Sequence, residues 1–436
     1  MKQSALTILT PVDPAHAAEL EPLLSQLGGN IAKQTLIPFD QLDRLHFMSL
    51  VLVESDKFGH QLVFESNFDG KPRDYLEQFA TRARAALDEI FHFCPGYPLS
   101  GDTYAVVSYF LRHAVYTDTF YVGCVGISRP RIYQERTLRE KIEAALDALP
   151  PGLTAPQIRR QVQELVRADP ELQWALQPAE IPSFWERILF WLPVALAAAV
   201  LIGIIVLAFL LGSWTGLLIL VAAAALFVGI SYLILRKHER SDPSISDEPL
   251  DQAVLAPHEH LRALVQQEDR RPQNHLASVT TVKPGLFRLA LLRTVLAAIN
   301  ALARYVANKG KLSGISSIHF ARWAVLNQGE QLLFLSNFDG SWEHYLGEFI
   351  DLAAKGLTAV WTNSTNFPKT RALLNEGAAD EQRFKSYARR SQTPAQLWYS
   401  AYPFLSVENI LENAAIRRDL WSDLSSDDLK AWLRRF

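Results

Sequence analysis

A run without any charged residue or histidine, from Ile188 to Leu235, constrains this chain more than any other feature. A single charge at mid-bilayer costs about 2.5 to 3.5 kcal/mol, so such a run is typical of membrane segments. It divides at Gly212 and Ser213 into stretches of 24 and 22 residues. As helices these measure roughly 36 and 33 Å, enough to cross a hydrocarbon core of about 30 Å. The sequence therefore predicts a two-helix transmembrane hairpin over 188–235.

The charges beside this run predict its orientation. The flanking basic residues are Arg187, Arg236, Lys237 and Arg240, whereas the connecting turn carries no charge. Because positive charges concentrate on the cytoplasmic side, we expect a multi-pass protein of the inner membrane with both soluble parts in the cytoplasm. The alternatives are a hairpin that enters one leaflet only and a hairpin buried in a soluble protein.

Small residues recur at every fourth position in both apolar stretches: Ala195, Ala199 and Gly203, then Ala225 and Gly229. Such residues let helices approach closely. We expect them either to close the hairpin or to form a homo-oligomer through the transmembrane helices.

An internal repeat lies on either side of the hairpin. Residues 61–79 (QLVFESNFDGKPRDYLEQF) match residues 331–349 (QLLFLSNFDGSWEHYLGEF) at 11 of 19 positions, at an offset of 270. Upstream, Pro11 matches Pro284 and His46-Phe47 matches His319-Phe320, both at an offset of 273. Downstream, Phe120-Tyr121 matches Trp398-Tyr399 at an offset of 278. A duplication of this kind fixes the architecture before any other feature is considered.

Both copies show the same order of expected elements. Each copy begins with a strand (4–12 in the first copy, 277–283 in the second) and a helix (14–27 and 286–308). Two strands follow (45–54 and 61–68 in the first copy, 318–327 and 331–338 in the second), and then a helix and a final strand (120–125 and 397–402). This order is the ferredoxin-like pattern. Because its helices cover one face of the sheet, we expect the two sheets to pack face to face.

The predicted fold class is α+β, with two ferredoxin-like repeats as an intrachain pseudo-dimer and a transmembrane hairpin. The expected units are a first repeat (1–137), a helical connector (138–187), the hairpin (188–235), a tether (236–274) and a second repeat with C-terminal helices (275–436). The arrangement resembles the dimeric α+β barrel superfamily, which includes chlorite dismutases, dye-decolorising peroxidases and small quinol-type monooxygenases. The segments SNFDG, QNHLASVTTVKPG, LSGISSIHFARW and LWYSAYP also resemble a family of bacterial membrane-associated proteins without an assigned activity.

Composition excludes several function classes. The 436 residues carry a net charge of −3, so no basic field favours nucleic acid. Cys94 and Cys124 neither form a disulfide framework nor lie in a metal-ligand spacing, and we expect no metal site. His258 and His260 form an HxH pair in the tether that His275 alone could join; a solvated pair is the simpler interpretation. The motifs of nucleotide and serine hydrolases are absent.

The duplicated SNFDG motif provides the first candidate site. Asp69 and Asp339 are expected to cap the helices that follow them, with Gly70 and Gly340 at an unusual backbone angle. Alternatively, Asn67, Asn337 and the two aspartates edge a pocket shared by the repeats. The dye-decolorising peroxidases carry GxxDG, and this resemblance implies that Asp69 and Asp339 assist peroxide cleavage at haem; here serine replaces the first glycine of that motif.

Histidines and aromatic residues provide the second candidate site. His46 and His319 are matched between the repeats, and strict alternation places His319 on the face of Ala321 and Trp323, with Arg322 opposite. Each histidine is a candidate haem ligand or acid-base group, or a buried hydrogen-bonded residue. The remaining candidates for ligand contacts are Arg322, Tyr121, Tyr399 and Trp398. For the three aromatic residues, packing in the core between the sheets is the simpler interpretation.

Three functions fit these features. The first is a membrane-anchored protein that binds a small apolar or amphipathic ligand, such as a lipid or a quinone-like molecule, between its repeats. The second is a haem-dependent or cofactor-free oxidase or peroxidase, with His319, Asp69 and Asp339 as catalytic groups. The third is a protein-interaction scaffold, which an exposed apolar patch rather than an internal cavity would indicate.

Overall fold

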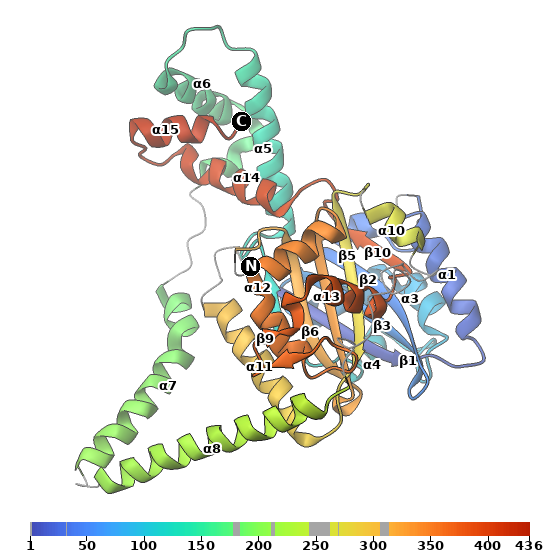
Figure 1. Cartoon of the computed structure of the whole chain (residues 1–436). Coiled ribbons are helices and arrows are strands. Elements are labelled where there is room, and N and C mark those ends of the chain that lie inside the picture. Colours follow the sequence, from blue (N-terminus) through green and yellow to red (C-terminus); the bar gives the residue numbers. More distant parts are fainter. Residues whose placement is uncertain are drawn as a thin grey trace.

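The chain is a mixed α+β protein with two antiparallel four-stranded sheets (Figure 1). The computed structural model describes residues 2–31, 33–177, 184–210, 214–243, 262–268, 270–305 and 314–436. The predicted turn at Gly212 and Ser213 and the pair His258 and His260 lie outside the described residues.

The main strands of the two repeats follow the expected order, with one helix after the first strand, but more than one helix lies between the third and fourth strands of each repeat. In the first repeat they are β1 (Gln3–Pro11), α1 (Ala17–Gly29), β2 (Leu45–Ser55), β3 (Gly59–Asp69), α2 (Pro72–Arg82), α3 (Arg84–Phe91), α4 (Thr103–Arg112) and β4 (Thr119–Val122). In the second they are β5 (Gln273–Thr281), α11 (Leu286–Tyr305), β6 (Ile318–Leu326), β7 (Gln331–Asp339), α12 (Trp342–Trp361), α13 (Glu381–Ser391) and β10 (Leu397–Ser400). A short hairpin, β8 (Thr370–Arg371) with β9 (Asn375–Glu376), lies between α12 and α13, and α10 (Arg262–Glu268) precedes β5.

Each sheet combines three strands of one repeat with the last strand of the other. The strand orders are β1-β3-β2-β10 and β4-β6-β7-β5, and all neighbours are antiparallel. Tyr399 of β10 pairs with Met48 of β2, and Tyr121 of β4 pairs with Ala321 of β6. Each repeat therefore supplies the expected elements but not a self-contained sheet.

Two glycines make room for the exchanged strands. A Cβ atom at Gly28, near the end of α1, would lie 1.9 Å from the backbone oxygen of Gln396, just before β10. A Cβ at Gly123, just after β4, would lie 2.1 Å from the backbone oxygen of Ile318. Both distances are far below van der Waals contact, so only glycine permits these approaches.

The alignment of the first strands needs a correction. Gln3 pairs with Asp69 and Gln273 pairs with Asp339, so β1 and β5 are equivalent at an offset of 270 rather than 273. The match of Pro11 with Pro284 was wrong, because Pro11 ends β1 whereas Pro284 lies beyond the end of β5.

The two sheets pack face to face, and helices cover their outer faces (Figure 1). Part of the interface is a buried aliphatic cluster from both sheets: Val51, Val53, Val63, Ala277, Ala324, Leu326, Leu333 and Leu335. Each outer face has its own apolar core beneath its helices.

A helical module projects from the sheets at the end of the molecule away from α8 (Figure 1). It consists of α5 (Arg129–Asp147), α6 (Ala155–Ala168), α14 (Val407–Leu420) and α15 (Ser426–Leu433). Its core contains Leu138, Ile142, Val162, Val166, Leu172, Ala175, Ile416, Leu420, Leu429 and Trp432. The part of the predicted connector over 138–177 thus packs against the last helices of the second repeat.

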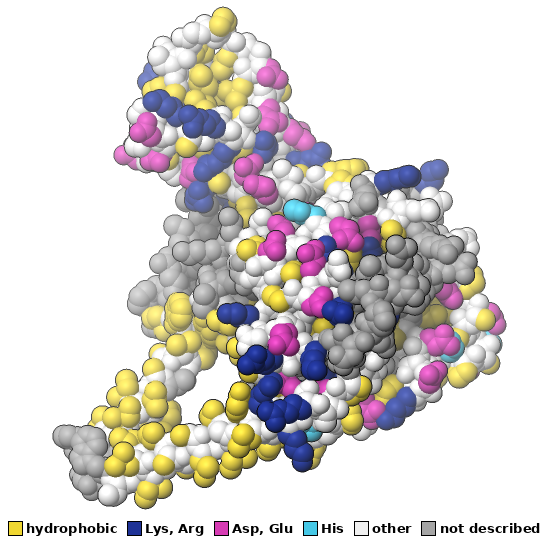
Figure 2. Space-filling view, in the orientation of Figure 1, with side chains coloured by type: hydrophobic (Ala, Val, Ile, Leu, Met, Phe, Trp, Pro, Cys, Tyr) yellow, Lys and Arg dark blue, Asp and Glu magenta, His cyan; other side chains and the backbone are white. Residues whose placement is uncertain are grey.

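In the part of the chain that the structure describes, three helices are long and apolar enough to cross a membrane: α7 (Phe184–Leu210), α8 (Trp214–Ser241) and α11. Hydrophobic side chains line α7 and α8, which diverge from each other toward the body of the protein (Figures 1 and 2). Gly203 and Gly229 face open space in the single chain. The predicted small-residue contacts therefore do not close the hairpin at these two positions.

Candidate functional site

The aspartates of the SNFDG motifs hold the helical module on the sheets. Asp69 Oδ2 accepts a hydrogen bond from the backbone N–H of Arg129, the first residue of α5, at 2.8 Å. Asp339 Oδ2 accepts one from Val407, the first residue of α14, at 2.7 Å. Each carboxylate also lies at the positive end of the helix dipole, which favours its negative charge.

The predicted caps on the following helices were wrong. No side chain caps α2, and the cap of α12 is Ser341, whose Oγ accepts a hydrogen bond from His344. The predicted backbone angle is confirmed, because Gly70 and Gly340 have φ values of +98° and +81°. These angles turn the chain sharply after each aspartate.

The matched histidines face these aspartates. His46 Nε2 lies 3.1 Å from Asp69 Oδ1, without the alignment of a hydrogen bond. His319 Nε2 lies 2.7 Å from Asp339 Oδ1 and is hydrogen bonded to it. Both aspartates thus have one oxygen directed at a helix end and the other at a histidine.

The prediction for the face of His319 was wrong, because the strand contains an irregularity. The register of β6 against β7 shifts between Ile318 and Phe320, and β2 shifts at the equivalent place around His46. A bulge puts consecutive side chains on one side of the sheet. His319 therefore shares the inter-sheet side with Phe320, while Ala321 and Trp323 point into the core beneath the helices.

Both pairs adjoin the phenol of Tyr402, and we call these five residues (His46, Asp69, His319, Asp339 and Tyr402) the Tyr402 cluster. The Tyr402 hydroxyl lies 2.8 Å from His46 Nδ1, and the two histidine rings are centred 5.7 and 5.8 Å from the Tyr402 ring. Burial, with the charges of Cys124 and both aspartates, raises the pKa of Tyr402 well above its ordinary value. The phenol therefore stays protonated, and its hydroxyl is hydrogen bonded to His46.

A second buried group, the Glu65 cluster, joins the sheets. It comprises Glu65, Ser49, Asn67, His275, Arg322, Asn337 and Trp398. Glu65 accepts hydrogen bonds from Ser49 (2.8 Å), Asn67 (2.9 Å), Asn337 (3.0 Å) and Arg322 (2.8 Å), and its Oε2 lies 2.7 Å from His275 Nε2. Trp398 donates to Asn337 Oδ1 at 2.8 Å. The cluster is a connected network in which both carboxylate oxygens are engaged.

The electrostatics of Glu65 follow from its neighbours. Burial alone would raise the pKa of this carboxyl, but the charges of Arg322 and His275 and their hydrogen bonds outweigh it, so the pKa falls well below its usual range. Arg322 is 1% exposed and also donates to the backbone oxygen of Leu6 at 3.0 Å. The pair is therefore ionised and fully buried between the sheets.

Sequence comparison of the repeats missed Glu65 because it is not shared. At the offsets of these strands, the position of Glu65 holds Leu335 in the second repeat, and that of Arg322 holds Ser49 in the first. The sequence did contain a signal for Glu65: it is a charged residue in an otherwise apolar strand, and the equivalent position of the other repeat is apolar.

The structure brings most of the candidate residues into these two clusters. Asn67, Asn337, Arg322 and Trp398 belong to the Glu65 cluster, and the two histidines and aspartates belong to the Tyr402 cluster. Tyr121 and Tyr399 lie apart from both. Tyr121 packs in the helix-side core of its sheet, and Tyr399 stacks on Phe39 at 3.9 Å, where burial raises its pKa to about 12.

These residues do not fit haem. The Nε2 atom of each candidate histidine already faces an aspartate within 3.1 Å, and both histidines are at most 2% exposed. Iron ligation would have to displace an aspartate from a helix end and separate the packed sheets. Among the described residues, no group of three or more His, Cys, Asp or Glu side chains could hold a metal ion.

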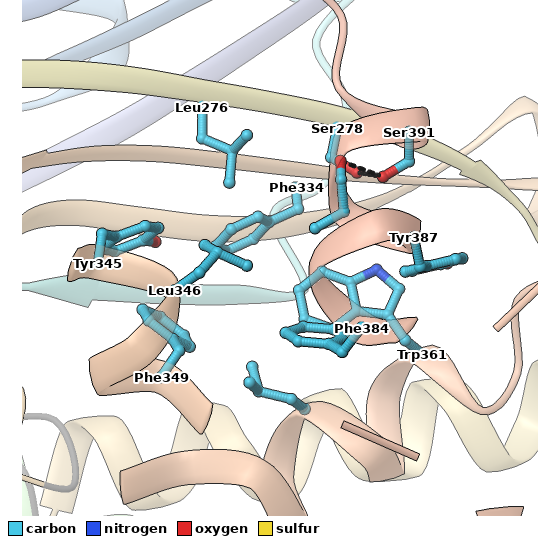
Figure 3. Close-up of a pocket in the computed structure, with 12 residues that line it drawn as sticks. Leu276, Ser278, Phe334, Tyr345, Leu346, Phe349, Trp361, Phe384, Tyr387 and Ser391 are labelled. Atoms are coloured by element: carbon cyan, nitrogen blue, oxygen red, sulfur yellow. Dashed lines mark hydrogen bonds between the residues drawn. The ribbon is translucent and has the colours of Figure 1, made fainter. Parts of the chain in front are cut away.

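Enclosed space in the two helix-side cores is small. A gap of about 20 Å³ lies between the second sheet and α12 and α13, surrounded by aromatic rings such as Phe334 and Trp361 (Figure 3). Its edge carries a 2.7 Å hydrogen bond between Ser278 and Ser391. The equivalent gap in the first repeat measures about 10 Å³. Ligand pockets are typically about 300 to 1,000 Å³, so these gaps hold a water molecule at most.

Larger hollows lie at the surface. One, of about 450 Å³, is lined by residues of α10, α12 and α13, both apolar (Val265 and Trp342) and charged (such as Glu343 and Lys385). The other, of about 350 Å³, is a groove between α5 and α6 of the helical module, lined by Ala145, Leu149, Gln161, Val162, Glu164, Leu165 and Ala168. This module groove is mostly apolar and open to solvent.

Comparison of the chain with protein-family models, curated proteins and solved structures finds no match.

Proposed function

We propose that this chain is a membrane-anchored protein-interaction platform, whose helical module binds a helical segment of a partner protein in the module groove. The observation that carries the proposal is the place of the duplicated aspartates. Asp69 and Asp339 hold the first residues of α5 and α14, so the motif that the repeats share serves to position the module.

The groove has the character of a helix-binding surface. Leu149 and Leu165 are half-buried, and Gln161 and Glu164 are exposed at its edge. Amphipathic helices bind such grooves through apolar residues at spacings of three and four. Figure 2 shows hydrophobic side chains at the surface of this module among charged ones.

Photo-crosslinking in intact membranes tests the groove. A photoreactive amino acid at Gln161, which lines the groove, should give a discrete crosslinked protein. The same group at Arg160, exposed on the same helix but outside the groove, should not. Leu165→Glu should abolish the product from Gln161 without changing the circular dichroism spectrum. Equal products from Gln161 and Arg160, or a product unaffected by Leu165→Glu, would contradict the proposal.

The membrane anchor is part of the same proposal. We propose that α7 and α8 cross the inner membrane as a two-pass hairpin, with both repeats on the cytoplasmic side. The uncharged turn and the flanking basic residues support this orientation. Reporter fusions after residue 212 and after residue 436 should report the periplasm and the cytoplasm, respectively; the same side for both would refute the two-pass topology.

The finer description of the fold is also a proposal. The shared order of elements and the face-to-face sheets support a pseudo-dimer of ferredoxin-like repeats similar to a dimeric α+β barrel, with the last strands exchanged.

A second candidate function is binding of a lipid or quinone-like molecule between the repeats, with a cofactor-free oxidase as its catalytic form. The Tyr402 cluster favours it, because a protonated phenol, two histidines and two aspartates are unusual in a buried interface. The absorption spectrum of the purified protein, with mass spectrometry of co-purifying molecules, tests it. A bound quinone or lipid that is lost in Tyr402→Phe would support this function over the platform.

A further inference from the structure

The helix α11 differs from the other helices that cover the sheets, because it is apolar on both sides. Its inner side is buried through Arg288, Leu292, Leu296 and Ala303. Its outer side exposes mainly apolar and small residues: Leu286, Ala290, Ala297, Ala298, Ala301 and Leu302. Leu286 and Leu302 are 86% and 56% exposed. No other element of the described protein covers this face.

Both apolar helices contact α11, at opposite ends. Near the start of α7, the Phe190 and Trp191 rings lie 5.1 and 5.5 Å from the ring of Tyr305, at the end of α11. Near the end of α8, the His238 ring stacks on Phe287 at 5.6 Å. The three helices thus form a triangle with α11 as its base (Figure 1).

Charge contacts fasten the α8 corner of this triangle. Asp242 Oδ2 accepts a hydrogen bond from Lys283 Nζ at 2.8 Å and another from the buried guanidinium of Arg288. Glu239 accepts hydrogen bonds from the backbone N–H groups of Ala372 and Leu373, next to β8, at 2.9 and 2.8 Å. The end of α8 is therefore joined to the body of the second repeat.

The size of the triangle matches a bilayer. At 1.5 Å per residue, the sides from Phe190 to Leu210 and from Trp214 to His238 measure roughly 30 and 36 Å, and the base from Phe287 to Tyr305 roughly 27 Å. The base then lies roughly 29 Å from the apex, and the two sides are tilted by roughly 12° and 35° from the normal to the base. This height agrees with a hydrocarbon core of about 30 Å, and both tilts fall within the range of about 0 to 40° of membrane helices. When the apex lies at one interface, α11 lies at the other.

The contacts of α11 with the sheet prevent it from being a third span. Thr119 of β4 donates a hydrogen bond to the backbone oxygen of Leu296 at 2.9 Å, and the Asn300 side chain accepts one from the backbone of Phe120 at 3.3 Å. Insertion across the bilayer would break these bonds and uncover Leu292 and Leu296, which are 0% exposed.

We infer that α11 lies in the plane of the membrane as an interfacial helix, with its outer face in contact with the boundary between lipid headgroups and acyl chains. Arg293 and Arg304, both exposed, lie at headgroup level and bind phosphate. This inference rests on the proposed membrane anchor, and it adds that the second repeat is held flat against the lipid.

Spin labelling of the full chain in nanodiscs of phosphatidylethanolamine and phosphatidylglycerol tests this placement. Single cysteines are introduced at Ala298 and Leu302, with the buried native cysteines replaced. The matched control is Ala144, an exposed alanine of α5 in the helical module, and Leu201 in α7 reports the anchor itself. Power saturation then compares collisions of each label with oxygen, which dissolves in lipid, and with a water-soluble nickel complex.

We expect the ratio of oxygen to nickel collisions to be several-fold higher at Ala298 and Leu302 than at Ala144, and higher still at Leu201. A high ratio at Leu201 with water-like values at both α11 positions overturns the interfacial placement and leaves the anchor in place. Water-like values at Leu201 as well overturn the anchor, and the inference with it. Values at Ala298 and Leu302 equal to that of Leu201 also overturn the inference, because they indicate a third span.

Discussion

Removing the charge of Glu65 should destabilise the protein strongly, because its buried partner Arg322 keeps its charge without a carboxylate beside it. In Glu65→Gln the side chain keeps its shape and an acceptor oxygen, but Arg322, 1% exposed, loses the only carboxylate within hydrogen-bond distance among its described contacts. Breaking a buried ion pair at one partner costs about 3 to 5 kcal/mol. At about 2 to 4 °C per kcal/mol, we expect the apparent unfolding midpoint to fall by roughly 6 to 20 °C.

The double variant Glu65→Gln/Arg322→Met shows whether the loss comes from the unpaired charge. Methionine fills much of the arginine volume without a charge, and replacing both partners of a buried pair is often nearly neutral. The double variant should therefore be more stable than either single variant, with a coupling energy of about 2 kcal/mol or more. The repeat mates Leu335 and Ser49 show that strands of this type pack without either charge.

The assay is thermal unfolding of the full chain in mild detergent at pH 7, followed by near-ultraviolet circular dichroism. Additive losses in the double variant would refute the reasoning, because they would mean that Glu65 and Arg322 stabilise the interface independently.

Three further predictions concern pH, the exchanged strands and the thiols. Because folding lowers the pKa of Glu65, this carboxylate contributes its full stabilisation above about pH 4.5, and the contribution is lost as the pH falls further. Between pH 5 and 3, the unfolding midpoint of Glu65→Gln should therefore depend less on pH than that of the wild type. Parallel curves for the two proteins would contradict this. Gly28→Ala should lower stability by about 1 to 3 kcal/mol through its clash with Gln396, whereas Gly29→Ala, which meets no atom within 4 Å, should be nearly neutral in the same melting assay. Burial raises the pKa of Cys94 to about 11 and that of Cys124 as well, so a thiol reagent should modify both only after denaturation, and rapid labelling of the folded protein would show that its core opens.

The sequence predicted the features that depend on local pattern or on identity between the repeats. The SNFDG identities aligned β3 with β7 correctly, since both strands end in the same turn with a positive-φ glycine. The uncharged run predicted α7 and α8, because length and composition alone decide whether a helix can cross a bilayer.

The exchange of the last strands could not be predicted in this way. β4 and β10 are both short and aromatic, so either one satisfies the free backbone groups at either sheet edge. Which strand joins which sheet is decided by close backbone contacts such as that of Gly28 with Gln396. Such contacts produce no periodic pattern in the sequence.

For related reasons, the sequence did not predict the Glu65 cluster, and it assigned the wrong contacts to the aspartates and histidines of the Tyr402 cluster. Proximity along the chain suggested that Asp69 caps α2, whereas it caps α5, a helix that begins 60 residues later. Comparing what the repeats share directed attention to the SNFDG motif and away from Glu65, which is present in only one of them. The bulges at His46 and His319 reversed the expected side of the strand, and bulges leave no trace in alternation.

The exchanged strands also determine when this protein can fold during its synthesis. The edge of β2 that receives β10 remains open until the ribosome has made about 340 further residues, from Ser55 to Leu397. At about 5 to 20 residues per second this takes roughly 17 to 70 s. During that interval the apolar helices α7 and α8 are synthesised, while the unpaired edge of β2 stays exposed. Such edges are common sites of aggregation. We therefore expect the newly synthesised first half to need chaperones, because its sheet is completed only by β10, the last of the described strands.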